Sequence, residues 1–172
     1  MKPNTATKKG LLTGLVMIII SVGIYLTMGN FQNGFQYVTY SVYVAGILWT
    51  LIAYSKQPTS GHRFGAYFSQ GFRCFIVVTL LMVIFTLVFL VVQPNLKEEM
   101  ASIYRTEIAK TGNYTQPEIA EKVAMAKKSF LPAMLMAAVF GYLIIGAMVT
   151  VIGGGFLSNK NLNAGLQKAR PN

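Results

Sequence analysis

Residues 10–55 contain no charged side chain and read GLLTGLVMIIISVGIYLTMGNFQNGFQYVTYSVYVAGILWTLIAYS. About 20 apolar residues cross the hydrocarbon core of a bilayer, so this tract is too long for one membrane span. A polar, turn-forming stretch, GNFQNG at residues 29–34, interrupts it. We therefore expect two transmembrane helices, over residues 11–28 and 35–54, joined by a short connection.

Two further uncharged tracts have the length of a membrane span. Their apolar bodies cover residues 74–92 and 130–156. The chain of 172 residues is 53% hydrophobic and only 12% charged, whereas a soluble domain has about 25% charged residues. We predict an all-α integral membrane protein with four transmembrane helices, whose first partner is the lipid bilayer.

The net charge of +10 comes from residues that flank the apolar tracts. One side of the predicted membrane receives nine basic and no acidic residues: Lys2, Lys8, Lys9, Lys56, Arg63, Arg73, Lys160, Lys168 and Arg170. The other side receives residues 93–129, with six basic residues and all five Glu. The positive-inside rule then places both termini in the cytoplasm. Nucleic-acid binding would need Lys and Arg gathered on one face, so we predict no nucleic-acid partner.

Residues 93–129 have the composition of ordinary soluble protein. Two capping-box patterns mark helix starts there, Asn95 with Glu98 and Thr115 with Glu118. A Thr-Gly-Asn sequence between them is typical of a helix end. We predict an extramembrane helical hairpin on the outer side, between the third and fourth spans.

The first helix of this hairpin carries an apolar stripe at helical spacing. Its members are Leu96, Met100, Ile103, Tyr104 and Ile108. The stripe either packs on its own partner helix or on the lipid surface, or it docks another protein. The mixed Glu and Lys side chains are typical of a solvated helix face with i,i+4 pairs. Adjacent glutamates such as Glu98 and Glu99 point about 100° apart on a helix, which argues against a catalytic dyad.

Residues 55–73, between the second and third spans, are rich in glycine and aromatic residues. Four rings follow one helical face at i, i+3, i+4 and i+8, which predicts an interfacial helix leading into the third span. We expect five side chains to contact lipid headgroups: Arg63, Arg73, Phe64, Tyr67 and Phe68. A substrate-binding role for His62 or Arg63 is the less favoured alternative, because no acidic residue lies on their side.

No Asp, Glu, Lys, Arg or His falls inside the core of any predicted span, although transporters and pumps usually carry such groups. Asp is absent, and the chain has one His and one Cys, so we expect no catalytic, cofactor or metal site. We expect Cys74 to be a buried, inert thiol, with palmitoylation or redox reactivity as the alternatives.

Small residues recur at a spacing of four in the fourth span. Ala133, Ala137 and Gly141 predict close helix packing, either within the chain or between subunits. Three consecutive glycines at 153–155 weaken a helix, so we expect the inner end of this span to fray, to bend or to allow very close approach, with fraying the favoured outcome.

The stretch FGAYFSQGF at residues 64–72 and the pair Pro94-Asn95 after the third span carry a resemblance. With four spans and an outer hairpin, the chain resembles a domain-of-unknown-function family of small four-span bacterial inner-membrane proteins. The resemblance implies the topology and a bacterial inner-membrane location. It brings no activity and no site residues.

These observations favour a non-enzymatic accessory or scaffold subunit of a larger membrane assembly. Its partner would be another protein or a second copy, bound through the 93–129 hairpin or the fourth span. The alternative is a homo-oligomeric channel or small-solute transporter, with a path between protomers lined by Tyr, Ser and Thr hydroxyls. An intramembrane enzyme would need a nucleophile–base pair or a metal cluster, which the sequence does not offer.

Overall fold

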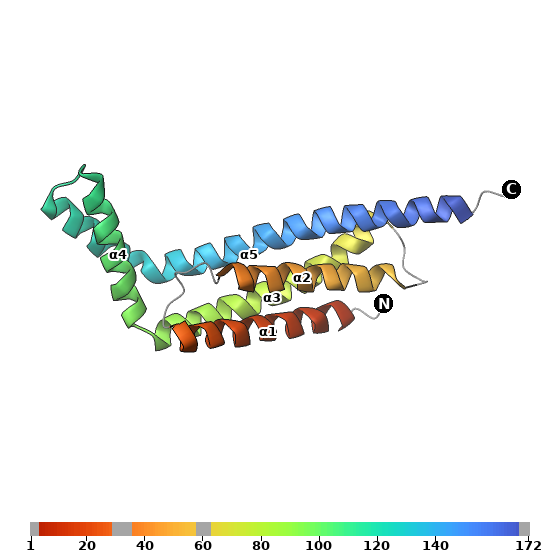
Figure 1. The fold of residues 1–172 in the computed structure, drawn as a ribbon, viewed down its shortest axis with the longest axis horizontal. Coiled ribbons are helices and arrows are strands. Elements are labelled where there is room, and N and C mark those ends of the chain that lie inside the picture. The colour runs from red at the N-terminus through yellow and green to blue at the C-terminus, as the bar shows by residue number, and fades with distance from the viewer. Residues whose placement is uncertain (1–3, 29–35, 58–62, 169–172) are drawn as a thin grey trace. The chain divides into compact units, whose positions relative to one another are not determined.

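The computed structural model describes residues 4–28, 36–57 and 63–168, and every regular element in these ranges is an α-helix. Figure 1 shows the five helices in chain order. They are α1 (Asn4–Met28), α2 (Gln36–Ser55), α3 (Phe64–Val92), α4 (Asn95–Thr111) and α5 (Gln116–Lys168). The all-α prediction is confirmed for this part of the chain.

Four of these helices, α1, α2, α3 and α5, are long and apolar enough to cross a membrane. The predicted number of transmembrane helices is confirmed, and the chain has the features of a multi-pass membrane protein. The helices are longer than the predicted spans: α1 begins at Asn4, and α3 begins at Phe64. The predicted interfacial segment is therefore, from Phe64 onward, the first part of α3. No proline or turn sequence separates Phe64 from the apolar body, so the backbone hydrogen bonds continue without a break.

The described helices fall into two compact units. The four-helix unit comprises residues 1–82 and 140–172, and the α4 unit comprises residues 83–139. The boundary runs through α3 and α5, so the polar residues around α4 belong to a different unit from most of α1 and α2.

In the four-helix unit, α2 and α3 make up the centre, and each contacts α1 and α5. The Thr50 hydroxyl on α2 donates to the Cys74 Sγ on α3 at 3.3 Å. The Tyr43 hydroxyl on α2 donates to the backbone oxygen of Tyr142 on α5 at 2.9 Å. Along the chain, α1, α2, α3 and α5 alternate in direction within this unit (Figure 1). The largest fully buried side chains are Tyr43, Tyr67, Met17, Ile47, Leu51 and Val78.

Glycines allow these helices to approach closely. A Cβ added at Gly10 of α1 would lie 2.6 Å from the Cys74 carbonyl oxygen, and one at Gly14 would lie 2.7 Å from Leu81 Cδ1. One added at Gly71 of α3 would collide with Thr150 of α5. Lipid tails are as apolar as leucine, so the hydrophobic effect does not drive helices together inside a membrane. Dispersion contacts at such close crossings therefore supply much of the free energy of helix association.

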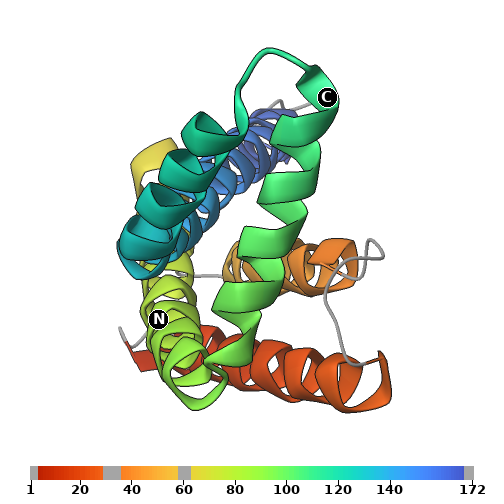
Figure 2. The same ribbon diagram turned by 90° about the vertical axis from the view of Figure 1, so that its left-hand side faces the viewer.

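In the α4 unit, α4 and the first part of α5 lie side by side and run in opposite directions (Figure 2). Gly112 ends α4 in the left-handed conformation, with φ of 67°, and its N–H donates to Ala109 O. The helix end predicted at the Thr-Gly-Asn sequence is confirmed. A side chain with a Cβ would be strained at this φ, which explains the glycine.

One of the two predicted capping boxes is present. Glu118 Oε2 accepts hydrogen bonds from the backbone N–H of Thr115 at 2.7 Å and from its hydroxyl at 2.8 Å. The box at Asn95 is wrong, because the helix already includes Asn95 and its N-cap is Pro94, with no side-chain cap bond. The backbone N–H groups of Leu96 and Lys97 donate instead to the backbone oxygens of Gln93 and Pro94. The first amides of the helix thus have backbone partners, and the Asn95 side chain does not cap them.

Helix α5 is continuous through Pro132 and through the glycines at 153–155. The favoured expectation, that the helix frays at these glycines, is wrong, and the alternative of close approach is confirmed. Gly153 and Gly154 lie against neighbouring helices: an added Cβ would come within 3.0 Å of Leu51 Cδ1 and 3.2 Å of Tyr67 Cβ respectively. Packing on both sides offsets the conformational cost of glycine. With 53 residues, α5 is roughly 80 Å long and extends well beyond the thickness of a bilayer.

Candidate functional site

The rings at the start of α3 form a ladder along the helix. Phe64 and Phe68 have centroids 6.1 Å apart, Phe68 and Phe72 6.0 Å, and Phe72 meets Phe75 edge-on at 5.1 Å. Phe64 and Phe72 are exposed, Phe68 is half-buried and Phe75 is buried. The outer rings of the ladder therefore form an exposed apolar surface on α3.

Two of the residues predicted to contact lipid headgroups, Arg63 and Arg73, are exposed, as the prediction requires. Tyr67 is not. Its side chain is fully buried, with its ring edge-on to Tyr54 of α2 at 5.1 Å and its Cβ facing Gly154 of α5. The headgroup prediction is wrong for Tyr67, because a position three residues from Phe64 turns toward the interior. His62 lies outside the described residues.

Cys74 is buried where α1, α2 and α3 meet. Its Sγ accepts the hydrogen bond from Thr50, and Gly46 O lies 4.0 Å away. Gly10 of α1 covers the Cys74 backbone. A thiol enclosed in this way has the packing of a small hydrophobic side chain.

The small residues predicted to pack closely do not supply the closest contacts between helices within the chain, and packing of this series between subunits stays a prediction. Ala133 and Ala137 are exposed, and Gly141 has only the Tyr40 hydroxyl near the position of an added Cβ, at 3.5 Å. The close contacts come from two other series at the same spacing. They are Ala6, Gly10 and Gly14 on α1, and Gly146, Thr150 and Gly154 on α5, all of which are buried. The four-residue spacing was a signal that could have identified both series from the sequence.

Three tyrosines meet between α2 and α5. The Tyr142 ring lies 5.6 Å from that of Tyr40 and 5.4 Å from that of Tyr43, edge-on in the second case. Other hydroxyls inside the unit bond to backbone one turn earlier, as Thr50 does to Gly46 O and Thr79 to Phe75 O. Most interior hydroxyls are thus engaged within the protomer. Among the described residues, the Oγ1 of Thr150 is buried against Gly71 without a hydrogen-bond partner.

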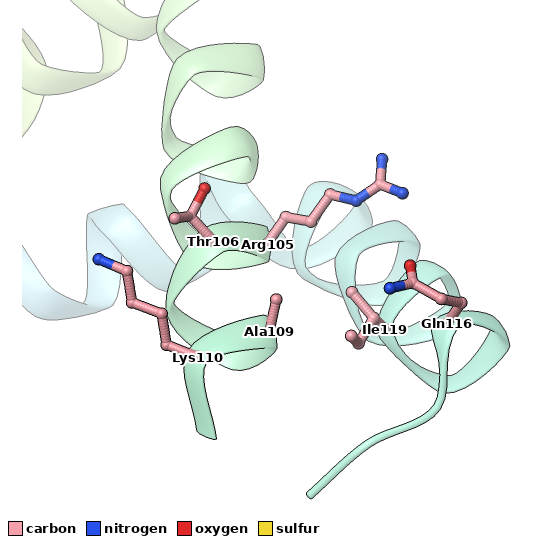
Figure 3. A pocket seen from close by; sticks show the side chains of 6 residues that line it. All are labelled: Arg105, Thr106, Ala109, Lys110, Gln116 and Ile119. Carbon is pink, nitrogen blue, oxygen red and sulfur yellow. The ribbon is translucent and has the colours of Figure 1, made fainter. Parts of the chain in front are cut away.

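A hollow of about 430 Å³ opens between α4 and α5 in the α4 unit. Its lining residues are Arg105, Thr106, Ala109, Lys110, Gln116 and Ile119. Figure 3 shows Ala109 and Ile119 facing each other, whereas the Arg105 and Lys110 side chains extend away in different directions. The two cations do not converge, so the hollow has the character of an apolar crevice between two helices.

Outside this hollow, polar contacts also join α4 to the first part of α5. Lys127 of α5 forms an ion pair with Glu98 of α4, a contact between helices and not the predicted i,i+4 pairing. The predicted apolar stripe of α4 is used in part, because Ile108 is buried whereas Tyr104 is exposed, and its other members, Leu96, Met100 and Ile103, are half-buried. Ala101, which the stripe did not include, and Ile119 of α5 are also buried. Hydrogen bonds from Thr115 hold the pKa of Glu118 below its ordinary value. Over the ranges that the structure describes, no three His, Cys, Asp or Glu side chains gather as a metal site would require.

Comparison with known proteins gives one match. The model of a family described as "Protein of unknown function (DUF4199)" matches residues 8–159. This chain belongs to that family. The matched region of the DUF4199 chain begins within α1 and ends within α5, so it contains all of the α4 unit and most of the four-helix unit. No curated protein and no solved structure matches the chain.

Proposed function

We propose that this DUF4199 protein is a non-enzymatic accessory or scaffold subunit of a larger membrane assembly in a bacterial inner membrane. Both termini would lie in the cytoplasm, because the nine basic residues without an acid flank that side. The α4 unit would stand on the outer side and contact the partner protein.

The observation that carries the proposal is the contrast between a closed interior and an open helix pair. Glycine contacts and hydroxyl-to-backbone bonds fill the centre of the four-helix unit. In the α4 unit, by comparison, Tyr104, Tyr114 and Met125 stay exposed beside charged side chains. Aromatic residues and Met are enriched at protein interfaces, and Lys and Glu are depleted at the interface core, so these apolar side chains are the natural contact points.

The alternative, a homo-oligomeric channel or small-solute transporter, needs hydroxyls on a surface shared between protomers. Tyr43, Tyr142, Thr50 and Thr150 are instead buried within the protomer. This favours the scaffold proposal. Reconstituted protein that moved a solute across liposomes would reverse that preference.

Site-specific photo-crosslinking tests the scaffold proposal. A photoreactive amino acid at Met125, which is 63% exposed in the α4 unit, should give a discrete adduct with a different membrane or periplasmic chain. The matched control is Met148, which is 57% exposed on the same helix but in the four-helix unit. There we expect lipid adducts only.

Two results would contradict the proposal. The first is that the protein purifies in mild detergent as a lone monomer and that neither Met125 nor Met148 gives a protein adduct in cells. The protein would then have no partner chain, and the scaffold proposal would fail. If Met148 forms the protein adduct and Met125 does not, the contact surface is the fourth span and not the α4 unit.

A further inference from the structure

We propose that Lys9 of α1 and Trp49 of α2 form a binding site for the phosphate of an anionic phospholipid. The site lies at the end of the four-helix unit where α1 begins and α2 ends. It is separate from Arg63 and Arg73, and it does not depend on the scaffold function.

The cation is held between two helices. The Lys9 ammonium lies over the Trp49 ring, 4.7 Å from its centroid. Lys9 is half-buried, and Trp49 is 47% exposed, so the ring positions the charge at the surface of the unit. A cation–π contact of this kind orients an ammonium group but does not neutralise it.

No carboxylate side chain in the same unit can neutralise Lys9. All five Glu lie between residues 98 and 121, within the α4 unit, and the chain has no Asp. A partly desolvated charge without an opposite charge is unfavourable. The counter-ion must therefore come from outside the unit.

The depth of the pair indicates a lipid phosphate as this counter-ion. Lys9 lies five residues after the start of α1, and Trp49 lies six residues before the end of α2. Lys9 lies two residues before the predicted first span, 11–28, and Trp49 lies five residues before the end of the predicted second span, 35–54, so the pair falls where headgroups and acyl chains of a bilayer would meet. Lys side chains and Trp rings are both typical of this zone.

The surface beside Lys9 suits an acyl chain. On α1, Leu12 and Val16 follow Lys9 on the same helical face, and both are exposed. On α2, the exposed Ala45 lies one turn from Trp49 on the corresponding face. A molecule with a phosphate and a long chain matches this surface, whereas a free phosphate ion would leave the apolar part uncovered.

Lipid binding to the purified protein in mild detergent, followed by native mass spectrometry, tests the site. Phosphatidylglycerol should bind more tightly than phosphatidylcholine with the same chains. Lys9→Gln should weaken phosphatidylglycerol binding about fivefold, the effect of one basic residue at an anionic surface. Lys8→Gln is the matched control: it removes the same charge from the exposed neighbouring position and should change binding less than twofold.

Two further variants separate binding from folding. Lys9→Arg keeps the charge and should retain most of the affinity, and Trp49→Leu removes the ring and should weaken binding while Lys9 stays. Equal loss for Lys8→Gln and Lys9→Gln would overturn the site in favour of general charge attraction. Unchanged binding for Lys9→Gln would also overturn it. So would displacement of the lipid by inorganic phosphate alone, because the occupant would then be a free anion.

Discussion

The four-helix unit and the α4 unit are built by different chemistry. In the first, Gly10, Gly71 and Gly146 allow close crossings, and Tyr43 bonds to the backbone of a neighbouring helix. In the second, an ion pair joins two helices that carry both signs of charge, and a capping box stabilises the start of one of them. Water screens charge and competes for hydrogen bonds, whereas lipid does neither. The difference matches the proposed placement of the four-helix unit in lipid and of the α4 unit in water.

Overpacking the four-helix unit should have the largest effect. A Cβ at Gly146 would collide with the Tyr43 hydroxyl and the Phe75 ring, so Gly146→Ala should destabilise the unit by about 1–3 kcal/mol. Gly155→Ala is the control on the same helix, since no atom lies within 4 Å of the added Cβ. It should be neutral or slightly stabilising. SDS-titration unfolding measures both, and equal stabilities would refute the close packing.

Removing an interhelical hydrogen bond should have a smaller effect. Tyr43→Phe deletes the donor to Tyr142 O and should cost about 0.6 kcal/mol, the average for such bonds in membranes. Tyr37→Phe removes the same hydroxyl from an exposed position on α2 and should cost nothing measurable. The same SDS titration reports both variants. A cost for Tyr37→Phe equal to that for Tyr43→Phe would contradict the assignment.

Acid should loosen the start of α5. The pKa of Glu118 is lowered by its bonds to Thr115, so the cap contributes stability above the ordinary pKa of 4.5. That stability should be lost as the pH falls through the lower, folded-state value. Hydrogen exchange of the first turn of α5 should therefore be protected near neutral pH and unprotected in acid. Thr115→Ala should expose this turn at both pH values, and protection that survives acid in the unmodified protein would argue against the cap.

The smallest effect should come from the ion pair. Lys127→Gln breaks the contact with Glu98, whose side chain is 65% exposed, and exposed pairs contribute about 0–1 kcal/mol. Added salt should shrink the difference between variant and unmodified protein. Lys128→Gln, which removes an exposed charge beside it, is the control. Thermal unfolding at two salt concentrations measures the effect, and a difference that grows with salt would contradict it.

Hydropathy and charge were enough to predict four spans, because an uncharged tract of sufficient length has few stable alternatives to a transmembrane helix. They did not predict which small residues pack. Ala133 and Gly10 belong to equally regular series, and only the positions of the neighbouring helices distinguish them. Tyr67 shows the same limit. Helical spacing places it on the face of Phe64, but the rotation of α3 against α2 and α5 buries it.

Thiol labelling tests the assignment of the two units to different surroundings most directly. In a Cys74→Ser background, Ser102→Cys places a thiol on the exposed face of α4, and Asn159→Cys places one near the inner end of α5. A membrane-impermeant maleimide should label the Ser102→Cys variant in intact spheroplasts and the Asn159→Cys variant only after permeabilisation. Labelling of Asn159→Cys in intact spheroplasts, with Ser102→Cys protected, would contradict the account.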